Sequence, residues 1–281
     1  MINEESAIQK YIDEKKDLVL QIIDNSETDD DDIYQKLTTF LDTNQYEKNK
    51  PELEHFLYFI SSISTNHHRG PNFFEKVEKI LTTSSKFYKP IFSNQELFTI
   101  FQQNKPVLLF LIKSKIIIID QIISQHSTQF QENIESGINC YFYPELDQII
   151  KSGRNENGNE ENLQRNDEIE NFERNRQKFE NESKLCSIIR EDLIVDFIQY
   201  INETNTSLSS TINRSIFETN SMFIEKDPTL IEYAAFFGSI QIMKYLEINK
   251  VELKTSIWLY AVHSNNAEII QFLEDKKINI D

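Results

Sequence analysis

Residues 229–280 contain the same pattern twice, and an internal repeat constrains the architecture of a chain before any single site is considered. The first copy is centred on Tyr233 and the second on Tyr260, an offset of 27 residues. Further matches extend along both copies: Ala234 with Ala261, Ile242 with Ile269, Leu246 with Leu273, Glu247 with Glu274, and Lys250 with Lys277. Two copies of one pattern predict two copies of one structural unit, packed side by side.

Each copy predicts a hairpin of two helices. Thr229 followed by Glu232 has the sequence of a capping box, which opens the first helix. Gly238 in the first copy and Asn265 in the second stand where that helix must end, because Gly and Asn tolerate the left-handed conformation of a helix cap. Apolar residues four positions apart then form the buried face of the second helix. One hairpin cannot cover its own apolar face, so each hairpin must stack on a neighbour.

The pattern resembles the ankyrin repeat, whose motif is T-P-L-H-x-A-A-x-x-G-H-x-E-I-V. The first copy matches this motif at four places: Thr229, the pair Ala234–Ala235, Gly238 and Ile242. In the second copy the corresponding residues are Ser256, Ala261, Asn265 and Glu268–Ile269. The resemblance implies an all-α fold in which helical hairpins stack as a solenoid.

Both copies also depart from the ankyrin motif at several positions. Leu230 and Ile257 replace its Pro, and Glu232 and Leu259 replace its His, so the hydrogen bonds that His makes between family repeats are in doubt. The offset of 27 residues is shorter than the ankyrin period of about 33, which predicts a tight loop in place of the long β-turn finger. Residues 188–197 resemble a degenerate first repeat.

The whole chain divides into three expected parts. Residues 1–151 form a helical N-terminal region, residues 152–184 a charged low-complexity linker, and residues 185–281 the ankyrin-like repeats. The repeats comprise the degenerate hairpin and then residues 229–253 and 256–280. This organisation, together with the run from Ser215 to Ser239, resembles divergent protist ankyrin proteins that carry a helical region of unknown function ahead of their repeats.

Apolar residues at helical spacing predict several helices before residue 107. They lie over residues 3–24, after the acidic run 29–32, from Pro51, from Phe73, and from the capping box formed by Ser93 and Glu96. The strongly apolar run 107–123 predicts one or two further helices. Its β-branched part, residues 116–119, is also compatible with a short strand, but helix is preferred because nothing nearby would pair with a strand.

The linker is too polar to bury a core, although its second half is compatible with a solvated helix. Its apolar residues between positions 159 and 182 are few: Leu163, Ile169, Phe172 and Phe179. Segments of this composition bury too little apolar surface to offset the entropy of ordering.

Composition excludes several classes of function. A net charge of −17 argues against nucleic acid and against anionic membranes, and is compatible with a basic protein partner. Only five Gly occur, and neither G-x-G-x-x-G nor a P-loop is found, so no cofactor is expected. Two Cys are too few for a disulfide framework and suit a reducing compartment. Without a signal peptide or an uninterrupted apolar span, a cytoplasmic location is expected.

No catalytic or metal-binding residue is expected. His67–His68 lacks neighbouring ligands at metal-binding spacing, and residues 29–32 lack the Gly and distal Glu of a calcium loop. Cys186 lies among apolar residues, which favours a packed thiol over a nucleophile.

The resemblance does imply a binding surface. In ankyrin repeats the two residues after the Ala pair lie on the concave, partner-binding side, and here they are Phe236–Phe237 and His263–Ser264. The alternative is that these residues pack on the preceding helices. The expected function is a non-catalytic protein-interaction scaffold or adaptor, with possible self-association through the uncapped C-terminal repeat. An enzyme whose active site lies in the N-terminal region, or a structural spacer without a partner, remain the alternatives.

Overall fold

The computed structural model describes residues 2–25, 31–118, 141–145 and 162–279. Within these ranges every regular element is a helix and no strand occurs, which confirms the all-α class for the described residues. The chain forms two compact units, unit 1 (Met1–Asn133) and unit 2 (Ile134–Asp281). None of the described helices combines the length and apolar character needed to cross a membrane.

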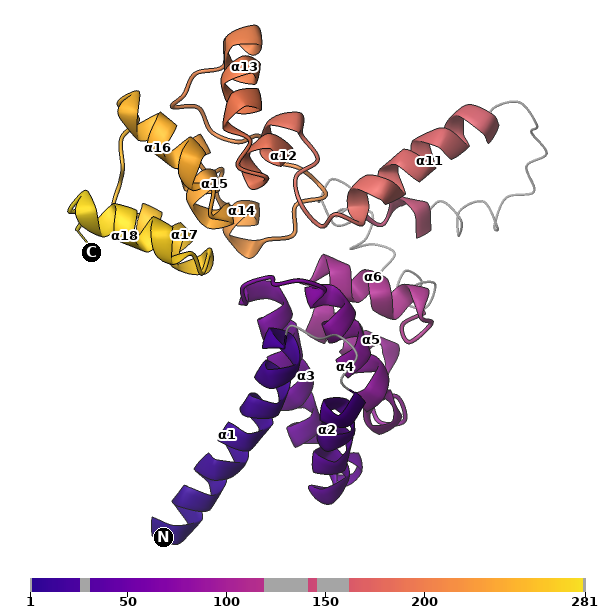
Figure 1. The fold of residues 1–281 in the computed structure, drawn as a ribbon. Coiled ribbons are helices and arrows are strands. Elements are labelled where there is room, and N and C mark those ends of the chain that lie inside the picture. The colour runs from indigo at the N-terminus through magenta and orange to yellow at the C-terminus, as the bar shows by residue number, and fades with distance from the viewer. Residues whose placement is uncertain (1, 26–30, 119–140, 146–161, 280–281) are drawn as a thin grey trace. The chain divides into compact units, whose positions relative to one another are not determined.

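Unit 1 is built around α4. Its helices are α1 (Ile2–Asp24), α2 (Asp31–Thr43), the 3₁₀ helix η1 (Tyr46–Lys48), α3 (Lys50–Asn66), α4 (Phe73–Tyr88), α5 (Asn94–Phe101) and α6 (Lys105–Lys113). α4 packs against α1, α2, α3 and α6 (Figure 1). The Nζ atom of the buried Lys76 donates to the carbonyls of Ile23 and Asn25, and so caps the C-terminal end of α1 with a cation.

Local sequence signals set three of the helix starts in unit 1. Asp31 and Asp32 lie in the first turn of α2, where the helix dipole favours negative charge. Pro51 lies in the first turn of α3. Ser93 and Glu96 form the complete capping box of α5. These three expectations from the sequence are confirmed.

The structure shows one helix of the one or two expected over residues 107–123, and it ends earlier than the apolar run does, because α6 stops at Lys113. The Ser114 hydroxyl donates to the carbonyl of Phe110, and Lys115 adopts a left-handed conformation with φ of 55°. The amides of residues 116 and 117 then donate back to the carbonyl of Leu111, which closes the helix end. Residues 116–118 form neither helix nor strand, and residues 119–123 lie outside the described ranges.

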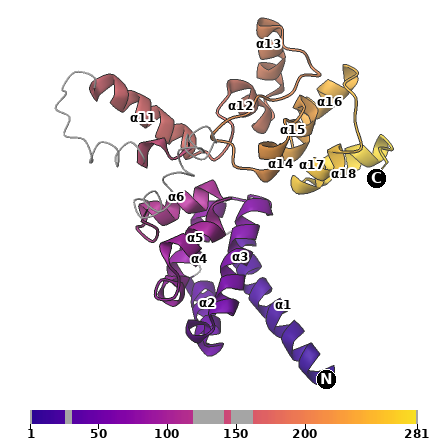
Figure 2. The same cartoon turned by 180° about the vertical axis from the view of Figure 1, so that it is seen from behind.

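Unit 2 contains three consecutive helix pairs. After α11 (Asn162–Arg176), the pairs are α12 (Lys184–Arg190) with α13 (Ile194–Thr204), α15 (Leu230–Phe237) with α16 (Ile240–Ile248), and α17 (Ile257–His263) with α18 (Ala267–Asp275), while α14 (Ser221–Glu225) precedes the second pair. α15 packs between α12 and α17, as both views show (Figures 1 and 2). Ala234, Ala235 and Ala261 are fully buried in these helices, where small side chains permit close approach.

The same turn joins the two helices of each pair. Its left-handed residue is Asp192 in the first pair, Gly238 in the second and Asn265 in the third, with φ of 51°, 77° and 51°. Side chains link one turn to the next, since the Asp192 carboxylate accepts the amides of Gln241 and Ile242 at 3.0 Å each. The Asn266 amide donates to the carbonyl of Gly238 at 3.2 Å. The repeat in the sequence is therefore also a repeat of backbone conformation in unit 2.

Residues expected to form a solvated linker include two buried polar side chains. Arg176, at the end of α11, is 1% exposed, and its guanidinium donates to both carboxylate oxygens of Glu145 at 2.7 and 2.9 Å and to the carbonyl of Tyr141 at 3.1 Å. Asn181 is also buried. The polar composition of this segment did not indicate such packing. Polar side chains can be buried when their charges are paired and their amide groups are hydrogen-bonded, and both conditions hold here.

A long connection, residues 205–229, separates the first pair from the second. Its ends are joined by an isolated antiparallel bridge between Thr211 and Thr229, and the amide of Ile212 donates to the carbonyl of Pro228 at 2.7 Å. α14 lies within the loop that this bridge closes. The corresponding connection between the second and third pairs, residues 249–256, is short and carries no helix.

Candidate interaction surface

Six ring side chains of unit 2 form one contiguous group, which we name the aromatic cluster. Its members are Phe223 of α14, Tyr233, Phe236 and Phe237 of α15, and Tyr260 and His263 of α17. α15 supplies three of them because positions 233, 236 and 237 fall on one helical face. The cluster therefore spans two neighbouring helix pairs and the loop that precedes them.

Phe236 lies between the second and third pairs. It is 6% exposed, and its ring stacks on that of His263 with centroids 4.2 Å apart and an interplanar angle of 17°. Phe236 therefore packs on the preceding α14 through Phe223, as the alternative expected, and also on the following α17. The stacked rings join α15 to α17 through their C-terminal ends.

Phe237 is half-buried and keeps part of its ring at the surface. Its ring lies 4.7 Å from that of Tyr233 and 4.9 Å from that of Phe236, and the guanidinium of Arg190 lies 5.9 Å from its centroid. The structure thus brings Phe236, Phe237 and His263 together. A partly exposed aromatic ring that is supported by buried rings can anchor a protein partner.

Ser264, the fourth residue predicted for this surface, has a local structural role. Its hydroxyl donates to the carbonyl of Ala261 at 2.6 Å and accepts the amide of Asn266 at 3.2 Å. These bonds satisfy backbone groups in the turn after α17. Ser264 is half-buried beside His263, so it borders the cluster without adding a ring to it.

Phe223 belongs to the cluster but was not anticipated from the sequence. It is 4% exposed, and its ring lies 4.4 Å from that of Phe236 and 5.0 Å from that of Tyr233. The ring is also nearly parallel to that of Tyr260, at 11° and 6.1 Å. The available signal was the short apolar run 222–224 inside a polar connection, which is too short to specify its packing partners.

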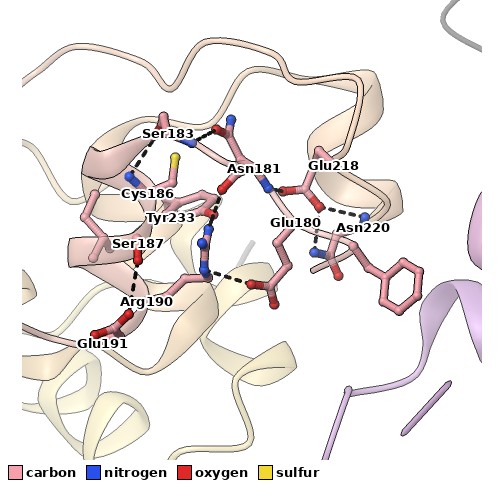
Figure 3. Close-up of polar contacts among 12 residues, drawn as sticks. Glu180, Asn181, Ser183, Cys186, Ser187, Arg190, Glu191, Glu218, Asn220 and Tyr233 are labelled. Carbon is pink, nitrogen blue, oxygen red and sulfur yellow. Dashed lines mark hydrogen bonds and ion pairs between the residues drawn. The ribbon is translucent and has the colours of Figure 1, made fainter. Parts of the chain in front are cut away.

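A buried polar network borders the cluster on the side of α12 (Figure 3). Arg190 Nη1 donates to the carbonyl of Asn181 and to the hydroxyl of Tyr233, each at 2.9 Å. Arg190 Nε also forms an ion pair with Glu180 at 2.8 Å. A single guanidinium thus joins α12, α15 and the segment that precedes α12, in the fixed geometry that favours Arg at such sites.

Glu218 forms the second part of this network, just before α14 (Figure 3). Its buried carboxylate accepts the amide of Asn181 at 3.2 Å and the amide of Thr219 at 2.9 Å. It also accepts the backbone and side-chain N–H groups of Asn220 at 2.8 and 2.7 Å. Four donors compensate for the loss of water around this carboxylate, so the chain is fixed immediately before α14 begins.

Two titratable groups beside Arg190, the Cys186 thiol and the Tyr233 hydroxyl, are held in their neutral forms. Burial raises the pKa of the Cys186 thiol, and burial also raises the pKa of the Tyr233 hydroxyl. A buried thiol with a raised pKa lacks the thiolate character of a reactive cysteine. Cys186 is therefore a packed side chain, in agreement with the sequence interpretation.

Glu232 connects the second and third helix pairs near the N-terminal ends of α15 and α17. One carboxylate oxygen accepts the amide and the hydroxyl of Thr229 at 2.9 Å each, and the other accepts the hydroxyl of Ser256 at 2.9 Å. Burial alone would raise the pKa of Glu232, but the hydrogen bonds from Thr229 and Ser256 outweigh it and lower the pKa. A cavity of about 130 Å³ lies beside this carboxylate.

Unit 1 offers different features. An open groove of about 700 Å³ runs along α1 and α2, and its lining includes Glu14, Asp32 and Lys36. His67 Nε2 lies 3.6 Å from a carboxylate oxygen of Asp24, a proximity that the sequence did not indicate. Across the described ranges of the whole chain, no three His, Cys, Asp or Glu side chains are grouped so that they could hold a metal ion.

Comparison of the chain with models of known protein families, with curated proteins and with solved structures finds no match.

Proposed function

We propose that the chain is a non-catalytic protein-interaction module, in which the three helix pairs of unit 2 stack as ankyrin-like hairpins. The observation that carries this proposal is the position of α15, which packs against the first helix of the preceding pair and the first helix of the following pair. A row of hairpins in contact only with their neighbours is the arrangement expected of a short solenoid. The recurring left-handed turn at Asp192, Gly238 and Asn265 supports the same assignment.

Two hydrogen-bonded links between hairpins also support the assignment. Glu232 stands where the ankyrin motif has His, and it accepts a hydrogen bond from Ser256 at the start of the next hairpin. Asn266 in turn reaches back to Gly238 in the preceding turn. These contacts supply inter-repeat bonds of the kind that the loss of His placed in doubt.

In this proposal the partner binds at the exposed edge of the aromatic cluster, around Phe237, His263 and Ser264. A rigid helical scaffold reduces the entropy lost on binding, and partly exposed aromatic rings supply binding energy at low conformational cost. The net charge of −17 favours a basic protein as the partner. A cytoplasmic location is part of the same proposal, because both Cys residues suit a reducing compartment.

Affinity capture with matched variants tests the proposal. Phe237→Ser removes the half-exposed ring, whereas Phe236 is too buried to replace without disturbing the packing. The control is Ile248→Ser, which removes an apolar side chain that is 71% exposed on α16. We expect Phe237→Ser to lose a protein that the wild type and Ile248→Ser both retain, with the single tryptophan, Trp258, reporting that unit 2 stays folded. Equal recovery by all three chains contradicts the proposal.

A further inference from the structure

Phe223 reaches the aromatic cluster from outside the three helix pairs. α15 and α17 supply the other five rings, and the ring of Phe223 contacts four of them: Tyr233, Phe236, Phe237 and Tyr260. Its neighbours in α14 are more exposed, since Met222 is half-buried and Ile224 is 40% exposed. The attachment of α14 to the cluster therefore depends mainly on one aromatic side chain.

The backbone around α14 also indicates that this helix is weakly attached to unit 2. α14 has only five residues, and among the described helices none packs extensively along it. It lies in the connection 205–229, whereas the connection 249–256 joins the next two hairpins without any helix. α14 is thus an addition to the repeated architecture and is not required to link one hairpin to the next.

The two ends of this segment are anchored differently. Before α14, the buried Glu218 carboxylate holds Asn220 through two hydrogen bonds. After α14, Lys226 forms an ion pair with the buried Glu232 at 3.6 Å, and Arg214 forms one with Asp227 at 2.6 Å in which both side chains are exposed. An exposed pair of this kind contributes little to stability. The backbone is fixed again where Ile212 donates to the carbonyl of Pro228 and Thr211 bridges to Thr229. Displacement of α14 therefore breaks the Lys226 ion pair, while the Glu218 network and this bridge stay intact.

We propose that the aromatic cluster is a binding site for an aromatic side chain carried on a short helical turn. Phe223 occupies this site in cis, and a partner segment of the same chemistry displaces it. The inference rests on the proposed interaction function and names both the partner's anchor and the element that regulates access to it. A covalently linked occupant competes at an effective concentration in the millimolar range, so binding in trans is strongly suppressed until α14 leaves.

A labelled peptide with the sequence of residues 215–228 serves as the probe in fluorescence anisotropy with the full chain. We expect the Phe223→Ala chain to bind this peptide at least ten-fold more tightly than the wild type does. The same peptide carrying Phe223→Ala is expected to bind neither chain. Ile224→Ala is the matched control, because it shortens a more exposed side chain of α14 and should leave peptide binding at the wild-type level.

Hydrogen exchange on the wild-type chain tests the proposal without any substitution. The amides of Phe223 and Ile224, which both donate to the carbonyl of Asn220, should exchange at least ten-fold faster than the amide of Tyr233 in α15. Equal protection of α14 and α15, or equal peptide binding by the wild-type and Phe223→Ala chains, overturns the proposal. Absence of peptide binding to Phe223→Ala also overturns it if Trp258 fluorescence shows that chain to be folded.

These outcomes separate this inference from the proposed function. The peptide assay needs no cellular partner, so a failed affinity capture leaves its result standing. Conversely, a failed peptide assay rules out the displacement of α14. Affinity capture with the Phe237→Ser variant still tests the hairpin surface.

Discussion

Gly238 is the residue at which the turn between α15 and α16 depends most on the absence of a side chain. Its φ of 77° lies in the left-handed region, and a Cβ atom there would lie 3.0 Å from Nδ2 of Asn266. The sequence predicted this helix end from the Gly itself, and the structure confirms it. Asp192 and Asn265 adopt a similar backbone conformation in the other two turns, where Asp and Asn tolerate the left-handed region better than most residues.

We expect Gly238→Ala to lower the free energy of unfolding by about 1–2 kcal/mol, because a non-Gly residue pays a steric penalty in the left-handed region. The link from Asn266 to the carbonyl of Gly238 should weaken as well. Urea unfolding followed by Trp258 fluorescence measures the effect. Gly70→Ala is the control, since a Cβ atom at Gly70 meets nothing within 4 Å. An unchanged urea midpoint for Gly238→Ala would contradict this account of the turn.

At the scale of single elements, the capping box of α15 couples helix formation to pH. The pKa of Glu232 is lowered in the folded chain, because the hydrogen bonds from Thr229 and Ser256 outweigh the effect of burial. A lowered pKa contributes stability that is fully present above the unfolded-state value of about 4.3. That stability is lost as the pH falls through the lower, folded-state pKa.

Glu232→Gln should therefore lower stability by about 1 kcal/mol at pH 7, the usual contribution of a helix cap. The difference from the wild type should shrink as the pH falls below about 4, where the wild-type carboxylate also becomes neutral. Urea titrations at several pH values, again followed by Trp258 fluorescence, provide the measurement. Glu274→Gln, at an exposed position of α18, is the control. A stability difference that stays constant down to pH 3 would show that the carboxylate charge is not the cause.

The elements differ in how far the sequence predicts them. Helix starts marked by Thr229 or Ser93 are predicted well, because a capping box is a contact between residues three positions apart. The end of α6 was missed, since an apolar run does not reveal the left-handed turn at Lys115 that stops it. Burial of Arg176 and the place of Phe223 were missed for a related reason. Both depend on contacts with residues far away in the chain, which no local pattern encodes.

At the scale of the whole molecule, the charge distribution limits which surfaces can meet. The chain carries a net charge of −17, yet residues 255–267 contain no Asp, Glu, Lys or Arg. This uncharged segment includes α17, where Leu259 and Val262 are each 67% exposed. The repeat aligns them with Glu232 and Ala235 of α15, which are buried on the helix that α17 packs against. The face of α17 that is exposed thus corresponds to a face of α15 that is buried.

We therefore expect the chain to self-associate weakly through α17. Depletion of charge is typical of the centre of a protein interface, and two uncharged faces can meet without the repulsion expected elsewhere on an acidic surface. Sedimentation velocity should show a weight-average coefficient that rises with protein concentration, and rises further in salt as the net charge is screened.

The double substitution Leu259→Ser and Val262→Ser should abolish this rise while leaving the urea midpoint nearly unchanged, because both side chains are mostly exposed. Ile248→Ser is the matched control, since it removes an equally exposed apolar side chain from α16. Association that persists in the double variant, or that is lost in the control, would place the contact on another surface. A wild-type chain that stays monomeric at all concentrations and salt levels would mean that the apolar area around Leu259 and Val262 is too small to offset the entropy lost on association.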